Sequence, residues 1–183
     1  MILLLADGTQ VPVTELPGHG PWTFLVLQPA PGPASARVAP EPGPVAPGQA
    51  SAGPEPGRAA RALTRFGRAV VPDLRGRPGW GEAPDGAGFL DLVDDLDRVR
   101  TRAGLGRPVL VGLGELVPLA VRAAADQPWA WRALLVSGPA ELPRLEVPAL
   151  TLDADPAPAV EELLGRLGPG PGWAGIAPDA PPR

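Results

Sequence analysis

Residues 107–126 read RPVLVGLGELVPLAVRAAAD, and this stretch decides the fold class. The apolar run over 108–112 predicts a short β-strand, and Gly112 and Gly114 predict a tight turn directly after it. Apolar residues then recur at helical spacing over 115–126, where Pro118 is tolerated because it lies in the first helical turn. A strand, a turn and a helix in this order are the repeating unit of a parallel α/β sheet.

The same alternation extends on both sides of this stretch. The early strands are separated by turns without an intervening helix, which predicts an antiparallel edge. We therefore expect one three-layer α/β domain over residues 1–183, with a mostly parallel sheet. The expected strands cover 2–5, 11–15, 23–27, 69–72, 108–112, 133–137, 149–152 and a last one over 173–177, and the expected helices cover 58–66, 88–103, 115–126 and 159–167.

One segment departs from this pattern. Residues 28–57 are rich in Pro, Gly and Ala and contain no aromatic side chain. Such a composition buries too little apolar surface to offset the loss of chain entropy. We expect a flexible, polyproline-like loop there.

The composition excludes several classes of protein. The formal net charge of −4 argues against a nucleic-acid binder, which needs a basic surface. The absence of Cys excludes disulfides and thiolate chemistry. No apolar run approaches the length of a membrane span, and the apolar start over 2–5 is too short for a signal peptide, so we expect a cytoplasmic protein. All 16 basic side chains are Arg, which indicates a GC-rich bacterial genome.

Five segments, in this order, resemble the α/β-hydrolase family over roughly residues 65–156. Two of them resemble the strand that leads into the nucleophile turn of that family and the strand that precedes its catalytic acid. The five segments are Val70-Val71-Pro72-Asp73-Leu74-Arg75-Gly76 with Gly81 and Pro84, Asp91-Leu92-Val93-Asp94-Asp95-Leu96, Arg107-Pro108-Val109-Leu110-Val111-Gly112, Arg132-Ala133-Leu134-Leu135-Val136-Ser137-Gly138 and Val147-Pro148-Ala149-Leu150-Thr151-Leu152.

The resemblance implies a catalytic apparatus that this sequence lacks. The family places a nucleophile in the turn G-x-S-x-G, and here the turn over 112–116 reads GLGEL, so Gly114 occupies the nucleophile position. The His-Gly that shapes the family's oxyanion hole is replaced by Gln28-Pro29, and Pro29 has no N–H to donate. Residues 176–183 contain no His to serve as the base. We therefore expect no catalytic residue of the usual kind.

Other side chains at the same edge are weaker catalytic candidates. Asp153 or Asp155 resembles the acid of the family, although a turn is the more ordinary role for carboxylates beside Pro156. Glu115 suits the first turn of a helix, where its charge is stabilised. Two carboxylates without further ligands do not make a metal site, so we expect no metal and no cofactor.

The connection between Val136 and Val147 is too short for the helical cap of the family, which predicts an open and shallow site. Trp80 is an aromatic side chain at the ligand-binding edge, where it either stacks on a ligand or packs its own loop. Ser137 is expected to cap a turn, and the only His in the chain, His19, is expected to be solvated.

Two side-chain patterns predict packing rather than chemistry. We expect Asp91, Asp94, Asp95 and Asp97 to form one solvated helix face. One of Trp129 and Trp131 is expected in the core.

Three functions fit these observations. The first is a non-catalytic α/β-hydrolase-fold protein, or pseudoenzyme, that binds an unidentified small molecule or protein at the old active-site edge through Trp80, Glu115 and Ser137. The second is an esterase-like hydrolase, a lyase or a cyclase that uses general acid and base catalysis without a covalent nucleophile. The third is the product of a decayed gene without a selected function.

Overall fold

The computed structural model describes residues 1–5, 8–29, 57–75, 77–80, 86–138, 142–152 and 156–167. Of the loop predicted over 28–57, only Gln28, Pro29 and Gly57 lie within the described residues. The strand predicted over 173–177 lies outside them, as do Asp153 and Asp155.

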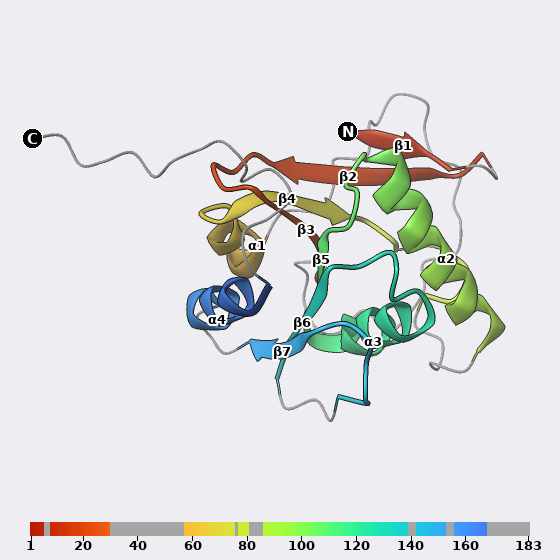
Figure 1. Ribbon diagram of the computed structural model, residues 1–183. Coiled ribbons are helices and arrows are strands. Elements are labelled where there is room, and N and C mark those ends of the chain that lie inside the picture. The colour runs from red at the N-terminus through yellow and green to blue at the C-terminus, as the bar shows by residue number, and fades with distance from the viewer. Residues whose placement is uncertain are drawn as a thin grey trace, which may run out of the picture.

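The described strands form one mixed sheet in the order β1-β2-β4-β3-β5-β6-β7 (Figure 1). The first two strands pair antiparallel with their neighbours, and all pairs from β4 to β7 are parallel. The predicted α/β class, with a mostly parallel sheet and an antiparallel N-terminal edge, is confirmed. The strands are β1 Ile2–Leu4, β2 Gln10–Leu16, β3 Trp22–Leu27, β4 Gly67–Pro72, β5 Val109–Gly112, β6 Ala133–Ser137 and β7 Ala149–Leu152.

Helices cover both faces of the sheet. In Figure 1, α1 (Arg58–Leu63) and α4 (Ala157–Leu167) lie on one face, and α2 (Ala87–Arg102) and α3 (Val117–Asp126) lie on the other. The 3-10 turn η1 (Gly114–Leu116) leads into α3. The helices α1, α2 and α3 precede β4, β5 and β6, so these three parallel strands are each reached from a helix that packs on a face of the sheet.

Two hydrophobic cores lie on the two faces, and alternate strand residues supply them. In β3, Phe24 and Val26 pack with α1 and α4, whereas Leu25 and Leu27 pack with α2 and α3. In β5 all four residues are buried, and its side chains alternate between the two cores: Val109 and Val111 join one, and Leu110 joins the other. This two-sided burial explains why the central strands are continuous apolar runs instead of alternating apolar and polar residues.

The sequence predictions and the observed elements differ mainly at their ends. The helix predicted over 58–66 ends at Leu63, because the Thr64 hydroxyl donates a 2.7 Å hydrogen bond to the Arg61 carbonyl and the chain then turns into β4. The helix predicted over 88–103 is present as α2, and it contains one of the five segments that resemble the family. Trp131 is the tryptophan that enters the core, where its indole donates a 3.0 Å bond to the Ala123 carbonyl.

The prediction of a fully solvated acidic face on α2 is wrong at Asp95. Only 1% of this side chain is exposed, and its carboxylate accepts bonds from the Arg77 guanidinium at 2.5 and 2.6 Å. A third bond, 2.9 Å long, comes from Arg98 on the next helical turn. Arg77 belongs to the loop after β4 and is itself only 10% exposed, so this ion pair ties that loop to α2. The helical period alone could not distinguish Asp95 from Asp91, which is exposed.

We predict that Asp95→Asn lowers the free energy of unfolding by about 3 kcal/mol, because it removes the carboxylate charge from the buried ion pair with Arg77. Urea unfolding followed by circular dichroism measures this loss. The matched control is Asp91→Asn on the same helix, which should change stability by less than about 0.5 kcal/mol. Equal effects of the two substitutions would show that the Arg77 contact does not stabilise the fold.

Candidate functional site at the carboxyl edge of the sheet

The turn between β5 and α3 is sharp and carries a glycine at its apex. Gly114 has a φ of +57°, in the region that side chains disfavour. Gly112 allows the helix to approach the strand, because a Cβ there would lie 2.6 Å from the Cβ of Ala120. The sharp strand-to-helix turn predicted from the sequence is therefore present, and its apex has no side chain.

Pro29 lies over this apex. The end of β3 runs beside the end of β5, with Leu27 opposite Gly112 and a 2.9 Å bond from the Leu113 N–H to the Leu27 carbonyl. The chain continues from Leu27 to Pro29, whose ring carbon Cγ is 3.0 Å from the point where a Cβ of Gly114 would be. The space that a side chain at position 114 would use is thus already bordered by a proline ring.

Ser137 comes to the same turn from the neighbouring strand β6. Its hydroxyl oxygen accepts a 2.9 Å hydrogen bond from the Gly114 N–H. The hydroxyl therefore stabilises the backbone of the turn, in a bond that connects two strand ends. The sequence predicted a capping role for Ser137 but not this partner.

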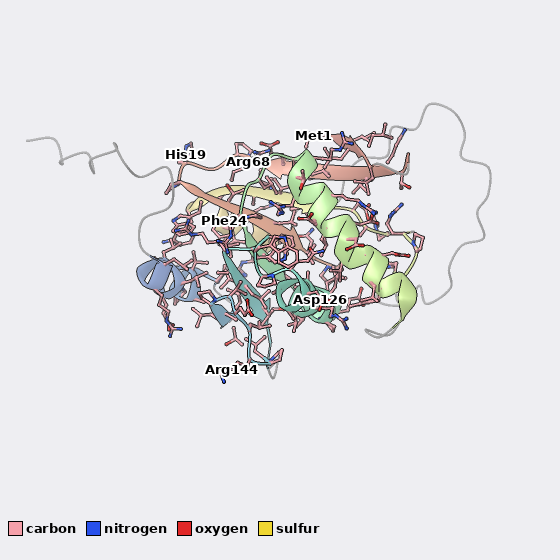
Figure 2. All side chains as sticks on the ribbon, turned by 45° about the vertical axis from the view of Figure 1, so that its right-hand side comes forward. Met1, His19, Phe24, Arg68, Asp126 and Arg144 are labelled. Atoms are coloured by element: carbon pink, nitrogen blue, oxygen red, sulfur yellow. The ribbon has the colours of Figure 1, made fainter. Side chains whose placement is uncertain are left out.

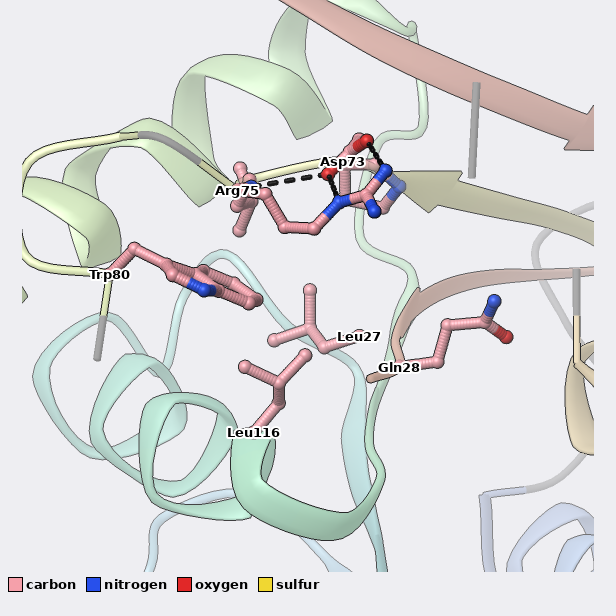
Figure 3. A pocket seen from close by; sticks show the side chains of 8 residues that line it. Leu27, Gln28, Asp73, Arg75, Trp80 and Leu116 are labelled. Atoms are coloured by element: carbon pink, nitrogen blue, oxygen red, sulfur yellow. Dashed lines mark hydrogen bonds and ion pairs between the residues drawn. The ribbon is translucent and has the colours of Figure 1, made fainter. Parts of the chain in front are cut away.

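A small apolar cavity lies beside the turn. Its walls include Leu27, Leu74, Trp80 and Leu116, and Figure 3 shows the Trp80 ring directed toward Leu27 and Leu116. The volume is about 10 Å³, close to the minimum that one water molecule needs. Trp80 is partly buried against the core, so the loop-packing role considered from the sequence is present in the structure. Leu116, in a position where the family pattern usually has Gly, contributes to filling this space.

An ion pair forms the polar wall of the cavity. Asp73, at the end of β4, accepts a 2.7 Å bond from Nε of Arg75 and a second one from its Nη2 (Figure 3). The hydrogen bond to Asp73 raises the pKa of Arg75, although burial acts in the opposite direction. Because both oxygens of Asp73 are engaged by one guanidinium, this carboxylate is not a free acid or base.

The side chain of Gln28 connects the end of β3 with the start of α1. Its side chain is buried and turns away from Trp80 in Figure 3. The side-chain oxygen accepts a 2.8 Å bond from the N–H of Gly57, the residue before α1. Gln28 therefore joins the end of β3 to the start of α1, a structural role.

The remaining candidates are dispersed. Glu115 is exposed at the start of η1. His19 is exposed in the turn between β2 and β3 (Figure 2), before the amino end of β3, whereas Gly114 follows the carboxyl end of the parallel strand β5. The length of β3, roughly 20 Å at the usual rise per residue, separates these two edges.

No group of three or more potential metal ligands occurs among the described residues. The predicted absence of a metal remains a prediction. In the same part of the chain, none of the helices is both long and apolar enough to span a membrane.

Comparisons with solved structures identify the fold. The chain is similar to an epoxide hydrolase from Vigna radiata, with a TM-score of 0.50 and 21% sequence identity, over 90% of this chain and 46% of that one. It is also similar to a deformylase from Pseudomonas putida, with a TM-score of 0.49 and 20% identity, over 75% and 45% of the two chains. The chain thus spans less than half the length of these two proteins. No family model and no curated protein matches the sequence.

The sheet order, the turn at Gly114 and the likeness to the epoxide hydrolase together define an α/β-hydrolase-like fold. At this level of identity the likeness concerns the fold alone, and function has to be argued from the site.

We predict that Gly114→Ala destabilises the protein more than Gly104→Ala does. Both glycines have positive φ, at +57° and +63°, and each alanine should cost roughly 1–2 kcal/mol for the backbone. A Cβ at Gly104 meets nothing within 4 Å, whereas one at Gly114 meets Pro29, so only Gly114→Ala adds a steric cost. Chemical unfolding of both variants measures the difference.

A double-mutant cycle isolates the contact with Pro29. Pro29→Ala in the Gly114→Ala background should recover the steric part of the loss, and in the Gly104→Ala background it should recover nothing. If the changes in the free energy of unfolding caused by the substitutions at positions 29 and 114 were additive, the contact between the two residues would be contradicted.

Proposed function

We propose that this protein is a non-catalytic member of the α/β-hydrolase fold that binds a partner through the carboxyl edge of its sheet. The observation that carries the proposal is Gly114 at the apex of the nucleophile turn, with Pro29 against it. A covalent acyl intermediate needs an oxygen or sulfur at this apex, and a glycine supplies neither. Pro29 also removes one N–H from the strand end that contributes to an oxyanion hole in this fold.

The positions of the candidate general bases also support a non-catalytic role. The chain has one His, and His19 lies at the amino edge of β3, a full strand length from Gly114. Asp73 is held by Arg75, and the Ser137 hydroxyl accepts from the Gly114 N–H. A general base must come within hydrogen-bond reach of the proton that it removes. None of these groups, as they are paired in the described part of the chain, is arranged for that task.

The binding role is supported by the shape of the edge. A cavity of about 10 Å³ has no room for an enclosed ester, since small-molecule sites are usually some 300–1,000 Å³. The surface around it offers the partly exposed Trp80 and the exposed Glu115. An aromatic side chain and an exposed carboxylate beside so small a cavity suit an extended ligand or a protein surface better than an enclosed small substrate.

We predict that the protein is not labelled by a fluorophosphonate serine-hydrolase probe and does not turn over p-nitrophenyl esters above the buffer rate. The reason is the missing nucleophile at Gly114. Labelled peptides are identified by mass spectrometry, so that any reacting residue is located. Probe-labelled Ser137, or saturable ester turnover, would overturn the proposal in favour of a hydrolase that uses a displaced nucleophile.

Gly114→Ser should also be inactive, because a serine without a base remains a weak nucleophile. The matched control is Gly138→Ser, which places a serine at another positive φ with nothing within 4 Å. Both variants should give the same background rate with p-nitrophenyl acetate. A burst of p-nitrophenol from Gly114→Ser alone would reveal a functional base near the turn.

A further inference from the structure

A second and larger hollow lies at the opposite edge of the sheet. It is an open groove of about 330 Å³, within the size range of small-molecule sites. Its walls come from the residues just before β5, β6 and β7, at the amino ends of three neighbouring parallel strands. The carboxyl edge with Gly114 lies at the other end of the same strands, so the two sites are separate.

Two arginines line this groove, and neither has an acidic partner among the residues that the structure describes. In the described part of the chain, eight arginines form ion pairs with Asp or Glu, but Arg107 and Arg132 form none. Glu146 also lines the groove, yet it pairs with neither of them. The whole protein has a formal net charge of −4, whereas the two arginines make this groove locally positive.

Both arginines are held in place by the fold. Nη2 of Arg107 donates to the carbonyls of Trp131 and Pro128, at 2.8 and 3.3 Å. The guanidinium carbon of Arg132 lies 4.6 Å from the ring centre of the buried Trp22. Such anchoring reduces the entropy that a side chain loses when it binds a ligand.

Arg132 also has an unsatisfied donor. Its Nε is buried and has no hydrogen-bond acceptor among the described residues. A buried N–H without an acceptor costs free energy, and such groups in native proteins call for an explanation. An anion in the groove would place negative charge beside the guanidinium, whose planar array of donors matches carboxylate and phosphate groups.

Apart from the two arginines and Glu146, the walls of the groove are apolar and include an exposed indole. Trp129 is 65% exposed, which is unusual for a tryptophan, and it stands beside Pro128 and Pro148. An indole face favours a flat apolar group by stacking. The groove thus combines two cationic side chains with one aromatic side chain.

We propose that this groove binds a small organic anion that carries a planar apolar group, with Arg107 and Arg132 on the anion and Trp129 on the ring. Carboxylate and phosphate share this chemistry, and the probes distinguish them. Glu146 repels such a ligand, so it limits the affinity. The proposal is independent of the role of the carboxyl edge.

The test is isothermal titration calorimetry of the whole chain with four probes, paired with tryptophan fluorescence. The probes are benzoate, phenyl phosphate, inorganic phosphate and the uncharged benzamide. We expect saturable binding of benzoate or phenyl phosphate, and affinities weaker by about tenfold for benzamide and for inorganic phosphate, which each lack one half of the recognised chemistry. The preferred anion identifies the headgroup.

Four variants test the residues. Arg132→Gln should weaken binding by about tenfold, and Trp129→Ala by roughly threefold or more. Glu146→Gln should strengthen binding by about two- to fivefold, because it removes a like charge. Arg144→Gln is the control, since Arg144 is exposed outside the groove (Figure 2) and should leave the affinity unchanged.

Thermal melting checks that each variant is folded. Trp129→Ala and Glu146→Gln change exposed side chains, so they keep the test informative if Arg132→Gln destabilises the Trp22 contact. Absence of saturable binding of either aromatic anion to the native chain would overturn the proposal. Binding that Arg132→Gln, Trp129→Ala and Glu146→Gln all leave unchanged would overturn it as well.

Discussion

The burial of both faces of the central parallel strands is the constraint on which the rest of the structure depends. All four residues of β5 are buried, and in β3 and β6 successive residues enter different cores. A strand of this kind is stable only when helices cover both faces of the sheet. The positions of α1 and α4 on one face, and of α2 and α3 on the other, follow from that requirement. The tight turn at Gly114 follows as well, because α3 has to fold back onto β5 directly after the strand ends.

The same constraint explains what the sequence could predict. Apolar runs and helical spacing gave the order and type of the described elements, because these patterns record burial. The sites are less predictable. A strand end indicates which residues share an edge, but not that Pro29 lies on Gly114 or that Ser137 accepts its N–H. Asp95 has the same helical spacing as solvated acids, and only the loop that carries Arg77 makes it a buried ion-pair partner.

The groove at the amino ends of β5, β6 and β7 was not predicted, because the residues that line it are far apart in the sequence and none of them belongs to a recognisable motif. Arg107 and Arg132 each precede a strand, where a charged residue is usually a solvated boundary. Only the parallel pairing of β5 with β6 brings them to one hollow. The sequence did contain a signal for this groove. An arginine precedes both β5 and β6, and neighbouring parallel strands begin at the same edge of the sheet, so the two arginines could have been expected to lie close together. Trp129 was considered from the sequence only as a core residue, a role that Trp131 takes instead.

The glycine at the apex of the turn and the proline above it are best understood together. A side chain at a positive φ stores strain of the order of 1–3 kcal/mol, which enzymes tolerate because the strained residue performs chemistry. Gly114 adopts a φ of +57° without that cost, and its missing Cβ leaves space for the Pro29 ring. Pro29 in turn restricts the backbone at the end of β3 and reduces the entropy of the unfolded chain. The glycine makes room for the proline ring, and the proline restricts the chain next to the glycine, so the two residues together stabilise the turn. A side chain at position 114 would therefore have to be accompanied by a smaller residue at position 29, because the Pro29 ring borders the place of its Cβ.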